Sequence, residues 1–248
     1  MISLGISIPM LARPSGGGGI VTSGLVMHLD AGNVSSYPGS GTTWTDLSGS
    51  GNNATLVNSP TFNSSNGGSL VFNGSNQYAT TAFSFSGRPF SIETWVRFTN
   101  QNAFQTVVGQ DTSQATPLGR FYHQKTDTSG GGGRPLNAFG FALTNTANAN
   151  VYCYDTSSIV LDTWYQYIIS VSASQLILYR NGSAITTVNN SDALASGTGN
   201  TLIAAGYYNN NIVDYLDGRI AISRFYNIAF DASQAAQNLD ADRGRFGL

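Results

Sequence analysis

Acidic residues are the first candidates for chemistry in this sequence. The chain has a single glutamate, Glu93, and its aspartates form no Asp-x-Asp or Asp-x-x-Asp pair on a strand that we predict. Hydrolysis of a glycoside with retention needs two carboxyl groups about 5–5.5 Å apart. Asp214 and Asp217 are three residues apart, but Asp217 lies at a loop edge, and we interpret Glu93 with Arg97 as a surface pair. We therefore predict no catalytic residues and no enzymatic activity.

The histidines and the cysteine give no evidence of a metal site or of a catalytic nucleophile. His28 and His123 lie far apart in the sequence and have no closely spaced partner of the kind that a metal pair shows. Cys153 is the single cysteine, so an internal disulfide is excluded, and we interpret it as a small buried apolar residue on a strand. The sequence also lacks the Gly-x-Ser-x-Gly motif of serine hydrolases.

Aromatic and amide side chains suit a different chemistry, the binding of sugars. Aromatic faces stack on sugar rings, and amides form hydrogen bonds with hydroxyl groups. The candidates that we expect in exposed loops are Trp44, Tyr122, Tyr152, Tyr154, Tyr207, Tyr208 and Asn209. The alternative is that the tyrosines cap sheet edges and that Asn-rich loops merely form turns.

The elements that must position these residues are predominantly strands. Residues 163–185 read as three strands joined by tight turns, with Asn181-Gly182 as the second turn. Phe90–Phe98 carries apolar residues on both faces, which indicates a central strand. Asn73-Gly74 is a further hairpin signal, and the one convincing helix begins after Asp231 with a capping box to Gln234.

Three segments together resemble a known superfamily. Trp164-Tyr…Leu178-Tyr-x-Asn-Gly182, Phe90–Val96 and Leu216–Asn227, the last followed by Phe230–Gln234, resemble the concanavalin A-like (laminin-G-like) jelly rolls. The resemblance covers roughly residues 24–246. It implies an all-β sandwich of two antiparallel sheets with a short C-terminal helix.

The resemblance also bears on function. Glycosidases of this superfamily carry Glu-x-Asp-x-x-Glu on one strand, a motif that this chain lacks. Asp217, at the start of the last long strand, resembles the position where some members hold a structural Ca²⁺, although an ordinary Asp-Gly turn explains it equally. Trp44-x-Asp-x-Ser-Gly-x-Gly51 resembles an early loop of phage and bacterial laminin-G-like modules, in which Asp46 and Ser48 satisfy local backbone N–H groups.

The N-terminal region has a pattern of its own. Apolar residues alternate with small polar residues, as in a strand with one apolar face, at Ile2, Leu4, Ile6 and Ile8. We predict an extended anchoring arm over residues 1–12, a Gly-rich linker over residues 13–23 and the sandwich domain over residues 24–248. The arm is either a frayed terminus or an anchor that adds a strand to a partner subunit. It resembles no signal peptide, because it lacks a basic segment and a continuous apolar run.

Composition limits the partners. The net charge is −2 and charged residues make up 10% of the chain, so we expect no nucleic acid and no membrane insertion. With its loose likeness to laminin-G-like proteins of tailed phages, the chain fits a non-enzymatic virion surface protein. Such a protein folds in the host cytoplasm, is anchored by its arm in several copies to other virion proteins, and binds host glycans or simply decorates the particle. The alternatives are a free-standing carbohydrate-binding or adhesion module, at an extracellular location, and a glycoside hydrolase.

Overall fold

A computed structural model gives the architecture of most of the chain. Residues 119–123 and 208 are described by their backbone alone. The predicted anchoring residues Ile2, Leu4, Ile6 and Ile8 lie outside the described residues, as does Asn209. The described residues are 18–85, 87–100, 104–110, 119–123, 139–147, 149–193, 199–208 and 211–248.

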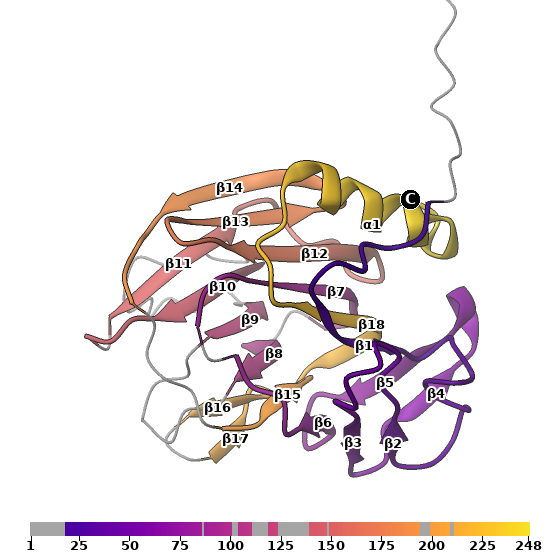
Figure 1. Ribbon diagram of the computed structural model, residues 1–248. Coiled ribbons are helices and arrows are strands. Elements are labelled where there is room, and N and C mark those ends of the chain that lie inside the picture. The colour runs from indigo at the N-terminus through magenta and orange to yellow at the C-terminus, as the bar shows by residue number, and fades with distance from the viewer. Residues whose placement is uncertain are drawn as a thin grey trace, which may run out of the picture.

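Two antiparallel sheets face each other in a sandwich (Figure 1), which confirms the predicted fold class. Sheet A has the order β14 (Ser183–Asn189), β13 (Gln175–Arg180), β12 (Trp164–Val171), β7 (Phe90–Phe98), β18 (Asp217–Tyr226), β5 (Ser69–Asn73) and β4 (Thr61–Asn63), with β1 (Leu25–Asp30) also paired to β18. Sheet B has the order β11 (Asn150–Asp155), β10 (Phe139–Thr144), β9 (Gly119–His123), β8 (Gln105–Gln110), β15 (Thr201–Ile203), β6 (Tyr78–Thr81), β3 (Ala54–Val57) and β2 (Thr43–Trp44). The other elements are the hairpin of β16 (Gly206–Tyr208) and β17 (Asn211–Val213), the 3₁₀ helix η1 (Ser65–Gly67) and the helix α1 (Ala232–Phe246).

The core lies between the sheets and follows from alternation along the strands. Ile92, Val96 and Phe98 of β7 face inward and are at most 3% exposed. From sheet B, Phe139 meets them with its ring 5.9 Å from that of Phe98. Burial of these aromatic and branched side chains removes apolar surface from water and holds the sheets together.

Two local sequence signals work as predicted. Asn181 and Gly182 adopt φ angles of 48° and 72°, which a two-residue hairpin turn between β13 and β14 requires. Asp231 caps α1, and its side chain and that of Gln234 form the reciprocal capping box.

The Asn73-Gly74 signal is wrong as a hairpin prediction. β5 belongs to sheet A and β6 to sheet B, so the turn carries the chain from one sheet to the other. The Asn73 carboxamide oxygen accepts hydrogen bonds from the backbone N–H groups of Ser75, Asn76 and Gln77. The turn chemistry is therefore local, while the sheet that receives the next strand is decided by packing.

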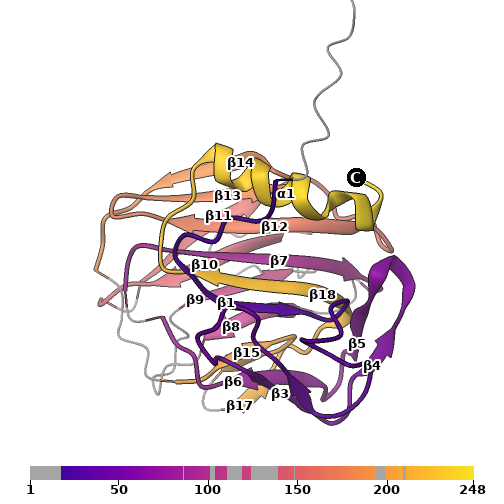
Figure 2. The same ribbon diagram turned by 45° about the vertical axis from the view of Figure 1, so that its right-hand side comes forward.

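Helix α1 forms a third layer on the outer face of sheet A (Figures 1 and 2). Phe246 stacks on Trp95 with ring centroids 4.1 Å apart, and Trp164 and Ile222 belong to the same buried cluster. Strand β7 is therefore packed on both faces, as its sequence predicts. Within the described residues no helix is long and apolar enough to span a lipid bilayer.

Part of the predicted linker is docked on this layer. The Val21 N–H donates to Asn238 Oδ1 at 2.8 Å, Gln237 Nε2 donates to the Gly19 carbonyl at 2.8 Å, and Val21 is 5% exposed. We call residues 18–23 the N-terminal strap. The Gly-rich linker over residues 13–23 stays a prediction, and its described part, the strap, is held to α1 by the buried Asn238 and the exposed Gln237.

Candidate functional site

Strand β11 presents two tyrosines on the outer face of sheet B. Val151 and Cys153 point inward, where Cys153 is 0% exposed and burial raises the pKa of its thiol to about 12. Cys153 is therefore the buried apolar residue that the sequence predicts. Alternation places Tyr152 and Tyr154 on the opposite face, and both are half-buried. They lie on a strand, and the expectation that they lie in loops is wrong.

The two tyrosine rings form one stacked pair. Their centroids are 5.4 Å apart and their planes differ by 14°. Tyr154 is paired with Gly140 of β10, and a Cβ atom at position 140 would lie 2.4 Å from Tyr154 Cδ1. Glycine at this position lets the Tyr154 ring lie directly against the sheet. We call Tyr152, Tyr154 and Gly140 the tyrosine platform.

Contacts with sheet A fix the strand that carries the platform. Thr186 Oγ1 of β14 donates to the Tyr154 carbonyl, and Asp155 forms an ion pair with Arg180 at 2.7 Å. Tyr167 Oη also donates to Asp155, at 3.0 Å. Because the backbone of β11 is held at these points, the platform is preorganised, and little ordering of β11 is needed when a ligand binds.

The other predicted tyrosines lie on other strands. Tyr122 lies on β9, opposite Gly140 in the strand register, so its backbone is two strands from that of Tyr154, with β10 between them. Tyr207 is half-buried on β16, and Tyr208 lies on the same strand. All three lie on strands, which corrects their assignment to loops.

Trp44 is not an exposed aromatic residue. Its side chain is 0% exposed and belongs to the main core cluster between the sheets. The loop after Trp44 is held by hydrogen bonds to Asp46. Asp46 accepts hydrogen bonds from the N–H groups of His28, Ser48 and Asn52, which confirms the predicted local role of Asp46.

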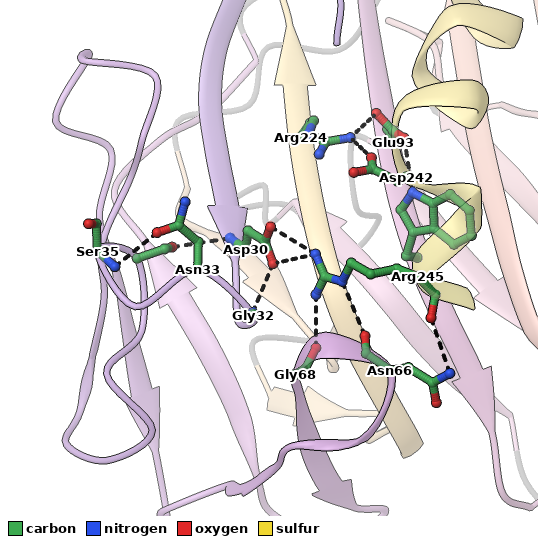
Figure 3. Close-up of polar contacts among 12 residues, drawn as sticks. Asp30, Gly32, Asn33, Ser35, Asn66, Gly68, Glu93, Arg224, Asp242 and Arg245 are labelled. Carbon is green, nitrogen blue, oxygen red and sulfur yellow. Dashed lines mark hydrogen bonds and ion pairs between the residues drawn. The ribbon is translucent and has the colours of Figure 1, made fainter. Parts of the chain in front are cut away.

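Glu93 is not part of a surface pair with Arg97, contrary to the prediction. Glu93 is 0% exposed and lies 3.2 Å from Arg224 Nη1 (Figure 3). Asn238 Nδ2 donates to it at 2.6 Å. Arg224 also pairs with Asp242 of α1 at 2.6 Å. Arg97 instead forms its ion pair with Asp162. Glu93 is thus a structural carboxylate under α1, with hydrogen-bond donors around it.

The contacts of Asp217 are to hydrogen-bond donors. Thr99 Oγ1 and Asn100 Nδ2 donate to its two carboxylate oxygens at 2.8 and 3.1 Å. The calcium assignment stays a prediction. Among the described residues no group of three or more His, Cys, Asp and Glu side chains could hold a metal ion.

Comparison with known families decides the relationship of the chain. The family model described as the concanavalin A-like lectin/glucanases superfamily matches residues 72–236. The chain belongs to this superfamily. No curated protein sequence matches the chain.

Solved structures of similar fold come from several proteins. Domain 4 of AbnA, an extracellular arabinanase of Geobacillus stearothermophilus in complex with arabinotriose, matches with a TM-score of 0.66 and 14% identity over 87% of this chain and 98% of that chain. The binding domain of botulinum neurotoxin DC in complex with SialylT matches with a TM-score of 0.65 and 11% identity over 89% and 52%. Trypanosoma rangeli sialidase in complex with the inhibitor DANA matches with a TM-score of 0.60 and 15% identity over 94% and 35%.

These similarities show a lectin-type sandwich fold. The chain spans nearly all of the arabinanase domain but about half or less of the other two chains. Of the residues predicted from sequence, the structure brings Tyr152 and Tyr154 together. Gly140 was missed, although the alternation of large and small residues in Phe139-Gly-Phe-Ala142 is a signal that could have found it.

Proposed function

We propose that this protein is a non-catalytic carbohydrate-binding module and that the tyrosine platform is its sugar-binding site. The observation that carries the proposal is the stacked Tyr152–Tyr154 pair on the outer face of sheet B, with Tyr154 packed against Gly140. Such rings offer an apolar face for a sugar ring and phenol hydroxyls at the edge. The superfamily and the sugar complexes of two similar folds support this assignment.

The carboxylates favour binding over hydrolysis. Glu93 and Asp155 are both 0% exposed, and each is engaged by an arginine, Arg224 and Arg180 respectively. A general acid or a nucleophile must reach the glycosidic bond. Neither of these two carboxylates is accessible to a substrate in this arrangement.

Glycan binding by matched variants tests the platform. We expect the wild-type protein to bind a subset of sugars on a glycan array and the double variant Y152A/Y154A to lose about tenfold or more in affinity. Phe62→Ala is the control, because Phe62 is 37% exposed but lies on β4 of sheet A. Calorimetry then measures the affinity for the best sugar.

Three outcomes contradict the proposal. Equal loss of binding in the Phe62→Ala control would indicate a general effect on the protein, and full binding by Y152A/Y154A would exclude the platform. Release of new reducing ends from a bound glycan would support the hydrolase alternative.

We further propose that the module is displayed on a virion and anchored by residues 1–12. The alternation of Ile2, Leu4, Ile6 and Ile8 supports an added strand. The strap is held to α1 on the outer face of sheet A, whereas the platform lies on the outer face of sheet B. An anchor that leaves from the strap would therefore hold the sugar-binding face away from the particle.

Deletion of residues 1–17 separates this role from sugar binding. We expect the shortened protein to bind sugars as the wild type does but to be lost from purified particles when it is co-expressed with the other virion proteins. Unchanged incorporation would contradict anchoring by residues 1–12 and would favour the free-standing adhesion module.

A further inference from the structure

Strand β14 forms one edge of sheet A. It pairs with β13 on one side, and no strand of the described part of the chain pairs with its other side. Figures 1 and 2 show β14 at the border of the sandwich, beside α1. The Asn190 N–H donates to the Ser174 carbonyl at 2.8 Å, in register with the β13–β14 ladder. Because hydrogen-bonded and non-hydrogen-bonded pairs alternate in such a ladder, the backbone N–H and C=O groups of Thr187 and Asn189 point away from β13.

The sequence of β14 does little to block the addition of another strand. It reads Ser-Ala-Ile-Thr-Thr-Val-Asn, without a charged residue or a proline. Thr187 and Asn189 are exposed. A bulge at Ile185 disturbs the ladder near the turn, but the pairing from Thr186 to Asn189 is regular. An exposed, uncharged edge of this kind readily accepts a further strand.

The core beside this edge is incompletely covered. Val188 of β14 and Val151 of β11 pack against the main core but remain half-buried. The two strands are neighbours across the sandwich, since Thr186 Oγ1 donates to the Tyr154 carbonyl and Cys153 Sγ lies 3.6 Å from the Thr186 carbonyl oxygen. A strand added to β14 would place side chains next to Val188 and bury more of its apolar surface.

The described chain begins close to the same edge. Gly18 borders a hollow on α1 together with Ala236. Gly182, the residue before β14, packs on Ala236 as well, because a Cβ atom at position 182 would lie 3.4 Å from Ala236 Cα. Gly18 and the start of β14 therefore flank the same turn of α1, about one helix diameter, roughly 10 Å, apart. Residues 9–17 can span up to about 30 Å when extended, which is ample for this distance.

We infer that in the free protein residues 2–8 add a strand to the β14 edge of their own chain. This segment, Ile-Ser-Leu-Gly-Ile-Ser-Ile, has its apolar residues on one face and matches β14 in length, with seven residues each. The shortest path for the linker brings Ile8 to the start of β14 and Ile2 to its end, so the pairing is antiparallel, as in the rest of sheet A. The apolar face would then lie beside Val188. The inference does not require the virion role, because the same segment can be exchanged for the edge of a partner subunit during assembly.

Hydrogen exchange in the full chain tests this pairing. We expect the amides of Thr187 and Asn189 to exchange at least about tenfold more slowly in the wild type than after deletion of residues 1–12. The Asn190 amide is the internal control, because its bond to Ser174 does not involve residues 1–12. Equal acceleration at all three amides would indicate a general loss of stability and would contradict the inference.

Matched variants of the N-terminal segment test which of its faces is buried. L4K/I6K places two charges on the apolar face, and we expect it to lose the protection of Thr187 and Asn189 as the deletion does. S3K/S7K adds the same charge on the opposite face and should keep the protection. Equal effects of the two variants would contradict a strand that packs its apolar face beside Val188.

The other outcomes identify what covers the edge instead. Rapid exchange of Thr187 and Asn189 in the wild type would show an open edge and overturn the inference. Protection that rises with protein concentration would assign the edge to a second copy of the chain and overturn it too. Particle incorporation is measured separately. A deletion that abolishes incorporation without changing exchange would reject pairing with β14 and keep the anchor, whereas the reverse result would keep the pairing and reject the anchor.

Discussion

The outer faces of the two sheets carry different side chains: charged residues are buried on sheet A, and neutral aromatic residues are partly exposed on sheet B. Under α1, Glu93 and Arg224 are at most 2% exposed and form ion pairs with each other and, for Arg224, with Asp242. On sheet B, the half-buried tyrosines of β11 carry no formal charge. Buried charges need partners of opposite charge and serve the fold, whereas a ligand can still contact neutral rings that are partly exposed.

The polar network under α1 continues at the C-terminal end of the helix. Arg245 forms two hydrogen bonds with the Asp30 carboxylate, both at 2.9 Å, and also bonds the carbonyls of Asn66 and Gly68 (Figure 3). These bonds tie the last turn of the helix to β1 and η1. The polar network on sheet A is therefore a fastening between distant segments, and variants can separate it from the tyrosine platform.

The largest expected effect is the loss of the buried cation. Arg224→Ala leaves Glu93 and Asp242 without their shared partner, and removal of one member of a buried ion pair costs about 3–5 kcal/mol in the free energy of unfolding. Urea unfolding measures the change. Arg97→Ala is the matched control, since its partner Asp162 is 61% exposed and such a pair contributes about 0–1 kcal/mol. If both variants lost a similar free energy of unfolding, the buried ion pair would contribute no more than the surface pair, which would contradict this prediction.

His28 gives the sheet A face a dependence on pH. Burial first, and then the Arg224 charge across the strand register, lower its pKa to about 3, with Arg245 acting in the same direction and Asp46 opposing. As the pH falls, the His28 imidazole is protonated near pH 6.5 in the unfolded state but only near pH 3 in the folded state. Stability from the neutral histidine is therefore complete above pH 6.5 and decreases as the pH falls toward 3.

Unfolding curves at several pH values check this linkage. Between pH 6.5 and pH 3, the free energy of unfolding should fall by roughly 1–3 kcal/mol less in His28→Gln than in the wild type. The platform variant Y152A/Y154A should keep the wild-type slope in the same window. Equal slopes for wild type and His28→Gln would show that His28 does not control the effect.

The attachment of the strap should be weaker than the ion-pair network but separable from it. Asn238 is 0% exposed, accepts from Val21 N–H and donates to Glu93 and to Tyr226 Oη. Asn238→Ala should lower the free energy of unfolding by about 1–3 kcal/mol. It should also greatly accelerate hydrogen exchange at the Val21 amide. Gln237→Ala is the milder control, because Gln237 is exposed and bonds the Gly19 carbonyl. Unchanged Val21 exchange in Asn238→Ala would contradict a fixed strap.

The smallest expected change in stability is on the tyrosine platform. Tyr154→Ala removes a half-buried ring from the Tyr152 stack, and such ring pairs contribute about 0.5–1.5 kcal/mol beyond their burial. We expect thermal unfolding to shift only slightly while sugar affinity falls. A stability loss as large as that of Arg224→Ala would mean that the pair serves mainly the fold.

Features that depend on local interactions could be predicted from the sequence. The Asn181-Gly182 turn, the Asp231 capping box and the Asp46 loop depend on partners a few residues away, so residue types and spacing suffice. The strand pattern of β7 and the burial of Cys153 followed in the same way from alternation and side-chain polarity.

Tertiary structure alone decided which distant groups meet. Glu93 finds Arg224 and Asn238 from 131 and 145 residues away, and the strap finds α1 across 217 residues. The turn at Asn73-Gly74 changes sheets, and Trp44 enters the core. Strand alternation fixes which residues share a face, but the packing of a sheet or helix against that face decides whether it is covered. For this reason the sequence could single out the two tyrosines of β11, while their stacking and the contact of Tyr154 with Gly140 came from the tertiary structure.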